Sequence, residues 1–148
     1  MSDQPDGLFS VEDQIVLLTG GSRGIGAAIA KGFAARGARV IICGREMETL
    51  QNAAAGMPGR HPVRPWQCDI ANPKEIQEMV AGTENEVGPI DTLVNVAGVN
   101  RRKPALEMSE EDFDFILDIN LKGAFVVSQA VGRGMVCLLY TSDAADES

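Results

Sequence analysis

The 148-residue sequence is poor in several residue types that mark special classes of protein. It contains three cysteines, one histidine, one tyrosine and one tryptophan, and aromatic residues make up 5% of it. Cys43, Cys68 and Cys137 have neither paired nor metal-like spacing, which indicates reduced thiols in a cytosolic protein. We therefore expect a cytoplasmic protein without a metal site.

Basic residues and long apolar runs are also scarce. Thirteen lysines and arginines stand against 21 acidic residues, so the formal net charge is −8. Such a surface argues against non-specific binding of nucleic acid and offers no basic patch to a membrane. No unbroken apolar run approaches the ~18 residues of a membrane span. Residues 1–7 lack the basic and apolar regions of a secretory signal. A small-molecule substrate is the partner that we expect.

Short apolar runs alternate with segments of helical pattern. The sequence predicts strands at 15–18, 39–43, 63–68 and 91–96, and helices at 27–37, 46–55, 73–87 and 109–133. Strands that alternate with helices imply a parallel sheet with right-handed crossovers. We predict an α/β fold with a doubly wound parallel sheet that is truncated after about four strands. Residues 1–10 are expected to be a flexible N-terminus, and residues 11–136 a single domain.

A glycine-rich loop joins the first expected strand to the first expected helix. Residues 19–26 read TGGSRGIG, and the strand–turn–helix context gives such a loop its mechanism. Gly20 permits a tight turn, Gly24 lets the backbone approach a pyrophosphate, and Gly26 lets the helix pack closely on the strand. The helix N-terminus offers free N–H groups and the positive end of its dipole to phosphates. The loop predicts a dinucleotide site in a Rossmann-type fold, and the alternative is a tight turn without a ligand.

The spacing TGxxxGxG resembles that of the short-chain dehydrogenase/reductase family, and other landmarks follow in the family's order. Residues 95–98 read NVAG where the family has NNAG, and Asn120 matches an asparagine of the following helix. Val96 departs from the motif, and we expect adjusted packing there rather than lost binding. The resemblance implies cofactor contacts from Thr19, Gly20, Ser22, Arg23, Gly24, Ile25, Gly26, Arg45, Asp69, Ile70, Asn95, Ala97 and Gly98.

The end of the second expected strand bears on the choice of nicotinamide cofactor. NAD-preferring members of the family carry an acidic residue there, which accepts hydrogen bonds from the ribose 2′-hydroxyl. This sequence has Gly44, followed by Arg45, and the glycine loop adds Arg23. Two guanidinium groups fit the 2′-phosphate of NADP better than the ribose 2′-hydroxyl of NAD. We predict that NADP is preferred, with NAD as a second cofactor, and the alternative is that both arginines are solvated surface charges.

The resemblance further implies hydride transfer with a carbonyl or an alcohol. The family uses a tyrosine as general acid/base, a lysine four residues later, a serine that binds the substrate oxygen, and the helix asparagine. Asn120 is the one catalytic residue that this sequence supplies, since its single tyrosine, Tyr140, is followed four residues later by Ala144. We expect the cofactor-binding half of an NAD(P)-dependent oxidoreductase, inactive by itself. The alternative is a non-catalytic dinucleotide-binding module.

The last residues break the family's pattern abruptly. Residues 137–147 (CLLYTSDAADE) resemble a translated adapter from the preparation of sequencing libraries. We therefore expect 137–148 to be a non-native tail. The alternative is a native but divergent C-terminus.

The segment after the NVAG motif suggests a substrate. Arg101 and Arg102, followed by a basic residue and a proline, resemble the gluconate 5-dehydrogenase and 2-deoxy-D-gluconate 3-dehydrogenase members of the family. Either arginine could pair with the carboxylate of a sugar acid, and a solvated basic turn is an equal alternative. A 3-oxoacyl-carrier-protein reductase is the other candidate activity.

The last expected helix suggests an assembly. The stripe at Phe113, Leu117, Leu121, Ala124 and Ser128 has helical spacing, and we predict that it serves as core and subunit interface. Related enzymes use this helix to form tetramers. We therefore expect the parent protein to be a homotetramer or homodimer.

Overall fold

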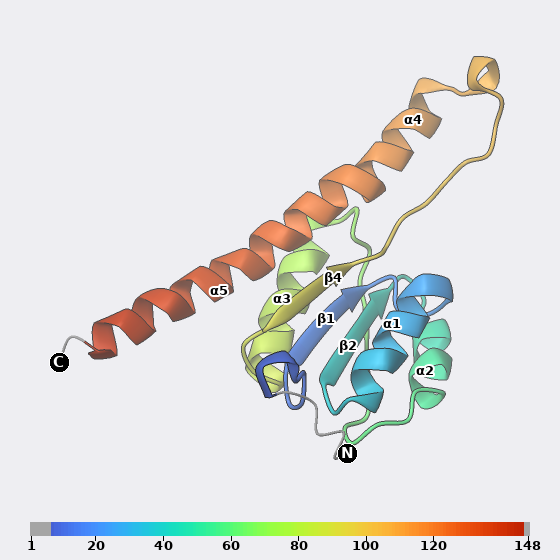
Figure 1. Ribbon diagram of the computed structural model, residues 1–148. Helices are drawn as coiled ribbons and strands as arrows, with labels where there is room; N and C mark the ends of the chain where they lie inside the picture. The colour runs from blue at the N-terminus through green and yellow to red at the C-terminus, as the bar shows by residue number, and fades with distance from the viewer. Residues whose placement is uncertain (1–6, 147–148) are drawn as a thin grey trace.

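One parallel sheet organises the chain, as the ribbon in Figure 1 shows. The computed structural model describes residues 7–146, and side chains as far as Leu139. The strands are β1 (Ile15–Thr19), β2 (Arg39–Gly44), β3 (Arg64–Gln67) and β4 (Thr92–Asn95). Their order is β3-β2-β1-β4, and all neighbours pair in parallel, with Leu17 opposite both Ile41 and Leu93. The predicted α/β fold with a parallel sheet of four strands is confirmed.

Helices connect the strands as the sequence predicts. They are α1 (Gly24–Ala35), α2 (Met47–Ala55), α3 (Pro73–Glu86), α4 (Glu110–Leu117) and α5 (Ala124–Asp146), with the short 3₁₀ segments η1 (Gly7–Phe9) and η2 (Ala105–Glu107). The π-helical segment η3 (Asp118–Gly123) joins α4 directly to α5, so that α4, η3 and α5 form one continuous helical rod. The predicted tail boundary after residue 136 coincides with no change of secondary structure, because α5 runs through it. Residues 1–6 and 147–148 lie outside the described residues, so the expectations about both ends stay predictions.

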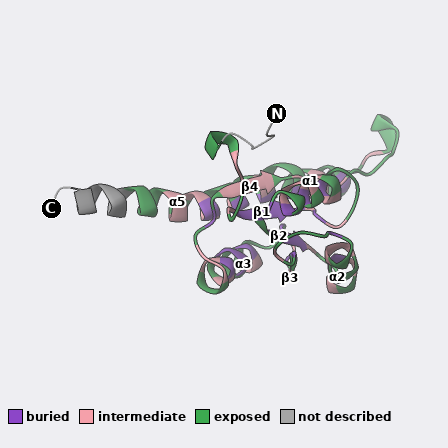
Figure 2. Ribbon diagram, turned by 60° about the horizontal axis from the view of Figure 1, so that its bottom comes forward, coloured by how far each residue is buried: buried purple, intermediate pink, exposed green. Residues whose placement is uncertain are grey.

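The sheet is covered on both faces, which explains why its two central strands, β1 and β2, read as unbroken apolar runs. Val16 and Leu18 pack with α1 and α2 on one face, and Leu17 and Ile41 pack with α3 and α5 on the other. Figure 2 shows these two pairs of helices on opposite sides of the strands. α1 and α2 each connect neighbouring strands, and α3 crosses from β3 at one side of the sheet to β4 at the other. Because all four strands run parallel, the glycine loop and the loops after β2, β3 and β4 lie at the same carboxyl-terminal edge.

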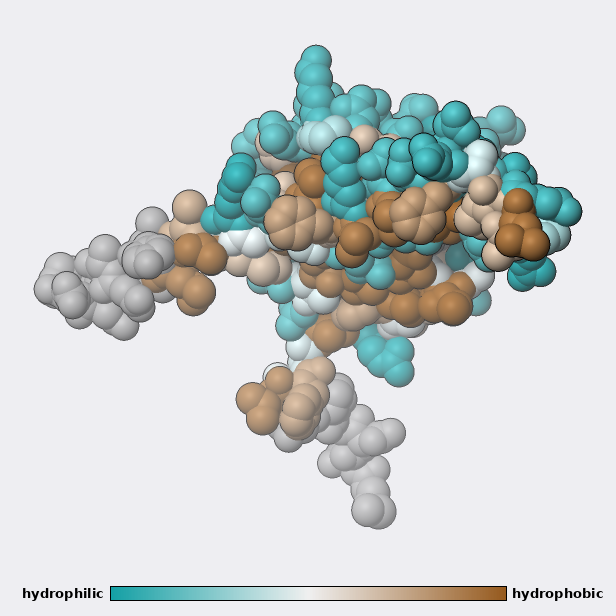
Figure 3. Space-filling model, turned by 90° about the horizontal axis from the view of Figure 1, so that it is seen from above, coloured by the Kyte–Doolittle hydropathy of each residue, from teal (hydrophilic) through white to brown (hydrophobic). Residues whose placement is uncertain are grey.

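The helical rod of α4, η3 and α5 packs on the sheet through a different face from the one predicted. Gly123, Val127 and Val131 are buried. Phe113 and Leu121, from the predicted stripe, are 54% and 65% exposed. The prediction that this stripe is core was wrong, because a second apolar stripe of the same rod, which includes Ile119, Val127 and Val131, packs on the sheet instead. The exposed stripe contributes to the apolar belt seen from above in Figure 3. Its role as a subunit interface stays a prediction.

One helical segment, Glu110–Leu139, is long and apolar enough on average to cross a membrane. The segment contains no unbroken apolar run of the length of a membrane span, because charged and polar residues interrupt it. A helix packed on the core of a protein passes the same test of length and composition. Val127 and Val131 of this segment are packed in the core, so the test is weak evidence for a membrane span.

Candidate functional site

The glycine loop makes the tight turn that its sequence predicts. Gly20 has a φ of +72°, and its N–H donates to the carbonyl of Cys43 at 3.0 Å. A Cβ on Gly26 would lie 2.0 Å from the carbonyl oxygen of Gly20, so α1 approaches the turn as closely as backbone allows. Gly24 differs, because a Cβ there would meet no atom within 4 Å. This open space at the start of α1, with a φ of +56° that favours glycine, fits the approach of a pyrophosphate.

Thr19 ties the glycine loop to the NVAG segment. Its side chain ends β1, is buried, and accepts the N–H groups of Val96 at 3.1 Å and Ala97 at 3.2 Å through Oγ1. Since Val96 is held through its backbone, valine at that position keeps this contact. Asn95 donates from Nδ2 to the Ser128 hydroxyl at 3.0 Å, which joins the end of β4 to α5. The predicted residues at the ends of the first and fourth strands are thus brought together.

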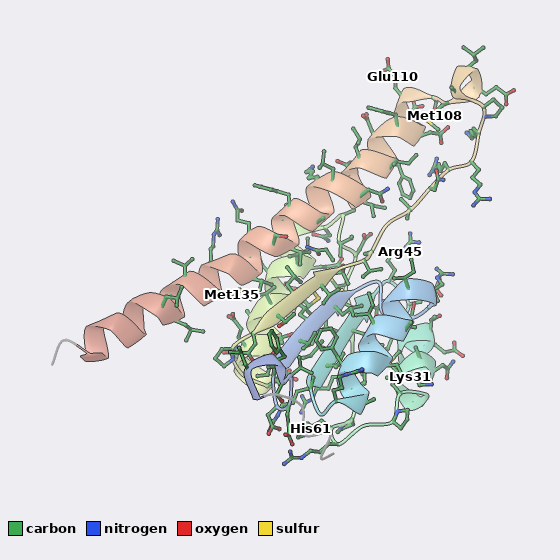
Figure 4. All side chains as sticks on the ribbon, in the orientation of Figure 1. Lys31, Arg45, His61, Met108, Glu110 and Met135 are labelled. Atoms are coloured by element: carbon green, nitrogen blue, oxygen red, sulfur yellow. The ribbon has the colours of Figure 1, made fainter. Side chains whose placement is uncertain are left out.

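A cleft of about 130 Å³ opens where these strand ends meet. Of the predicted cofactor residues, Gly20, Ser22, Arg23, Arg45, Asp69, Ile70, Ala97 and Gly98 line it. Thr19, Gly24, Ile25, Gly26 and Asn95 do not, and they form the turn, the helix start and the strand end beside it. Figure 4 places the labelled Arg45 at this edge of the sheet, with His61 at the opposite edge.

The predicted cofactor residues leave out part of the lining, above all the two buried cysteines. Cys43 and Cys68 line the cleft beside Val99 and Ile119. Burial is the main cause that raises the pKa of each thiol to about 12, so both stay protonated and act as apolar lining. Within the described part of the chain, no group of three or more histidine, cysteine or acidic residues could hold a metal ion.

Asp69 lies in a turn that is fixed from several sides. Its backbone N–H donates to Oε2 of Glu75 at 2.7 Å, and its own Oδ1 accepts the N–H of Ala71 at 3.0 Å. The other carboxylate oxygen of Glu75 accepts from the Asn72 side chain, which caps α3. This network leaves Oδ2 of Asp69 without a hydrogen bond among the described residues. An amino group such as that of adenine would fit this acceptor.

Asn120 lies in the π turn and not at the cleft. Its side-chain Oδ1 accepts the N–H of Val99 at 2.7 Å, and its Nδ2 donates to the carbonyl of Val99 at 2.8 Å. Both the oxygen and the nitrogen of the side-chain amide are thus hydrogen-bonded to Val99, and they clamp the loop after β4 to the helix. A Cβ on Gly98 would lie 3.2 Å from Oδ1 of Asn120, so this glycine permits the clamp. π turns recur at functional sites of helices, and this one positions Gly98 and Val99 beside the cleft.

The two candidate substrate arginines have different surroundings. Arg101 pairs with the buried carboxylate of Asp112 and lies over the ring of Phe115, 4.2 Å from its centre. Lys103 pairs with the other oxygen of Asp112. Arg102 lies between them in sequence, is exposed, and has no ion pair among the described residues. Arg101 therefore fastens the loop to α4, whereas the Arg102 guanidinium forms no ion pair among the described residues.

Asp112 makes the fold sensitive to acid. Its hydrogen bonds to Lys103 and then Arg101 hold the pKa of the carboxyl well below its usual range. The stability that this carboxylate contributes is therefore complete above its unfolded pKa of about 3.9 and is lost as the pH falls below that value. We expect wild type to lose more stability than Asp112→Asn between about pH 5 and pH 3, as urea unfolding midpoints would measure.

The matched control for this effect is Asp114→Asn, because Asp114 is exposed on the same helix. The Asp13 carboxyl, whose pKa is lowered by His61, titrates in all three proteins and cancels in the comparison. Equal acid sensitivity of wild type and Asp112→Asn would contradict the assignment.

Comparison with known proteins gives one family. The family model described as short chain dehydrogenase matches residues 14–142. Gluconate 5-dehydrogenase of Gluconobacter oxydans is 40% identical over 133 residues, which cover 89% of this chain and 52% of that protein. A 3-oxoacyl-[acyl-carrier-protein] reductase of Thermotoga maritima is 38% identical over 129 residues, covering 85% and 52%. The chain spans about half the length of the curated relatives it matches.

Solved structures agree with this result. A short-chain type dehydrogenase/reductase from Mycobacterium marinum superposes with a TM-score of 0.83 at 35% identity, over 88% of this chain and 53% of that one. L-Sorbose reductase from Gluconobacter frateurii, solved with NADPH and L-sorbose, gives a TM-score of 0.79 at 28% identity, over 85% and 49%.

Proposed function

Because the chain belongs to the short-chain dehydrogenase family, we propose that it forms the dinucleotide-holding part of an NAD(P)-dependent oxidoreductase. The observation that carries this proposal is the convergence of the glycine turn with the ends of β2, β3 and β4 on one cleft. The relatives that match are dehydrogenases and reductases, which supports redox chemistry for the whole protein.

Each part of the cleft has a proposed task. The N-terminus of α1, opened by Gly24, binds the pyrophosphate, while Asp69 and Ile70 hold the adenine. Ala97 and Gly98 form the wall that leads toward the nicotinamide, and Asn120 keeps that wall in place through Val99. The bound nicotinamide would supply or accept the hydride. The serine, tyrosine and lysine used by the family are expected in the half of the relatives that this chain does not match.

NADP is the cofactor that we propose to be preferred, with NAD as the second. Arg23 and Arg45 line the cleft, and neither forms an ion pair among the described residues. Guanidinium groups without a carboxylate partner suit a 2′-phosphate. The similar sorbose reductase was solved with NADPH, which supports the same choice.

Binding of the two cofactors to the purified chain tests this proposal. We expect NADPH to bind about tenfold more tightly than NADH in calorimetry, the ratio that one charge-assisted hydrogen bond supplies. Arg45→Gln should remove most of this difference, whereas Lys31→Gln, an exposed residue of α1, should leave it unchanged. Absence of binding by both cofactors would overturn the proposed function, and equal affinities would overturn the preference alone.

A sugar acid is the substrate class that we propose for the whole protein. The exposed Arg102 supports this, since its guanidinium lies in the loop after β4 and is free to pair with a carboxylate. The relative that acts on gluconate supports it as well. The second candidate is reduction of a 3-oxoacyl carrier protein, favoured by the Thermotoga relative.

We expect no turnover of gluconate with NADP by this chain, and measurable turnover would contradict the inactivity predicted for it.

A further inference from the structure

A side pocket branches from the cleft between the glycine loop and α2. Its volume is about 50 Å³, and its lining consists of Ser22, Arg23, Gly44, Arg45, Glu46, Thr49 and Leu50. Ser22, Arg23, Gly44 and Arg45 also line the main cleft, so the two spaces are adjacent and share a wall. Two cations and one carboxylate therefore line the same small pocket. Position 44, where NAD-preferring members of the family carry an acid, is a glycine here, and Glu46 follows two residues later.

The carboxylate of Glu46 accepts one hydrogen bond from its own helix. Glu46 is the residue that precedes the first turn of α2, and its Oε2 accepts the hydroxyl of Thr49 at 3.0 Å. This bond leaves Oε1 without a hydrogen bond among the described residues. The backbone before it is fixed as well, because Gln67 donates from Nε2 to the carbonyl of Arg45 at 3.0 Å. The acid is thus an exposed part of the pocket lining, and its second carboxylate oxygen is an acceptor.

The charges of the pocket do not neutralise one another. Among the described residues, no ion pair within 4.0 Å joins Glu46 to Arg23 or Arg45. A phosphate entering the pocket would therefore meet attraction from two guanidinium groups and repulsion from one carboxylate. A hydroxyl in the same place would carry no charge to be repelled and could donate to Glu46.

We propose that Glu46 is a specificity-determining residue that weakens binding of a 2′-phosphate and favours a free ribose 2′-hydroxyl, so that the site accepts both NADP and NAD. This inference rests on the proposed dinucleotide function. Arg23 and Arg45 set the preference for the phosphorylated cofactor, and Glu46 limits how large that preference is. Removing the charge of Glu46 should therefore strengthen the preference for NADP.

The experiment uses two fragments of the cofactors, adenosine 2′,5′-bisphosphate and adenosine 5′-monophosphate, with binding to the full chain measured by calorimetry. Glu46→Gln keeps the shape of the side chain and an oxygen for Thr49. We expect it to tighten binding of the bisphosphate about five- to tenfold, and to leave the monophosphate unchanged or weakened within about twofold. Far-ultraviolet circular dichroism verifies that the variant is folded.

The matched control is Glu48→Gln, which removes the same charge from the first turn of α2 at a residue outside the pocket lining. The inference would be overturned if Glu46→Gln changed the affinities for the two ligands equally. It would also be overturned if Glu48→Gln produced the same selective change in affinity. If wild type binds both fragments and Glu46→Gln leaves their ratio unchanged, only this inference fails. If wild type binds neither fragment, the proposed function fails with it.

Discussion

Gly26→Ala is expected to lose about 3 kcal/mol of stability, at the upper end of the usual range for overpacking a close contact. The new Cβ would lie 2.0 Å from the carbonyl oxygen of Gly20 and 2.9 Å from its carbonyl carbon. Both are backbone atoms of a tight turn and cannot rotate aside. Relief requires α1 to move away from β1, and that displaces the helix N-terminus proposed to bind the pyrophosphate. We therefore expect NADPH binding to be lost together with stability.

Gly32→Ala on the same helix is the matched control. A Cβ there would meet only the end of the Arg36 side chain, at 3.7 Å. Because glycine is unfavourable in a helix interior, this variant should gain about 0.5–1 kcal/mol. Urea unfolding measures both changes, and they should have opposite signs. If both alanine variants were equally stable, the close packing of α1 on the turn would not be the reason for glycine at position 26.

These two glycines show which parts of the fold were predictable from sequence. The glycine loop was readable because each requirement is local: a strand, a turn with positive φ, and a helix that starts within a few residues. The start of the last helix at residue 109 was readable for the same reason, because Ser109 and Asp112 form both hydrogen bonds of a capping box. Short apolar runs predicted the strands, and β1 is buried throughout.

Features that depend on a distant partner were not predictable. Arg101 and Arg102 are neighbours of one residue type, and only the position of Asp112, 11 residues later than Arg101, separates their tasks. The last helical rod has two apolar stripes at the same spacing, and only its packing on the sheet shows which of them is buried. Glu46 was missed because its place in the pocket follows from the direction of α2, which the sequence does not state.

Thr19→Val should lose about 2–4 kcal/mol, because the replacement keeps the shape of the side chain but removes the acceptor of two backbone N–H groups. Those groups belong to Val96 and Ala97, and Thr19 is 1% exposed, so water cannot easily replace the hydroxyl. The same bonds set the path of the segment that continues to Gly98 in the cleft. We therefore expect NADPH affinity to fall as well, by about tenfold or more.

Thr92→Val is the control at the other end of the β4 pairing. Its hydroxyl is half-buried and makes a single bond, to Oε1 of Gln14 at 3.2 Å, so the loss should stay below about 1.5 kcal/mol with unchanged NADPH affinity. Urea unfolding gives the stabilities, and calorimetry under conditions where each variant is folded gives the affinities. A Thr19→Val variant that is destabilised but binds NADPH normally would make Thr19 a structural residue alone. Reduced affinity in the folded variant would mean that one hydroxyl, at the end of β1, holds the wall of the cofactor cleft in its binding position.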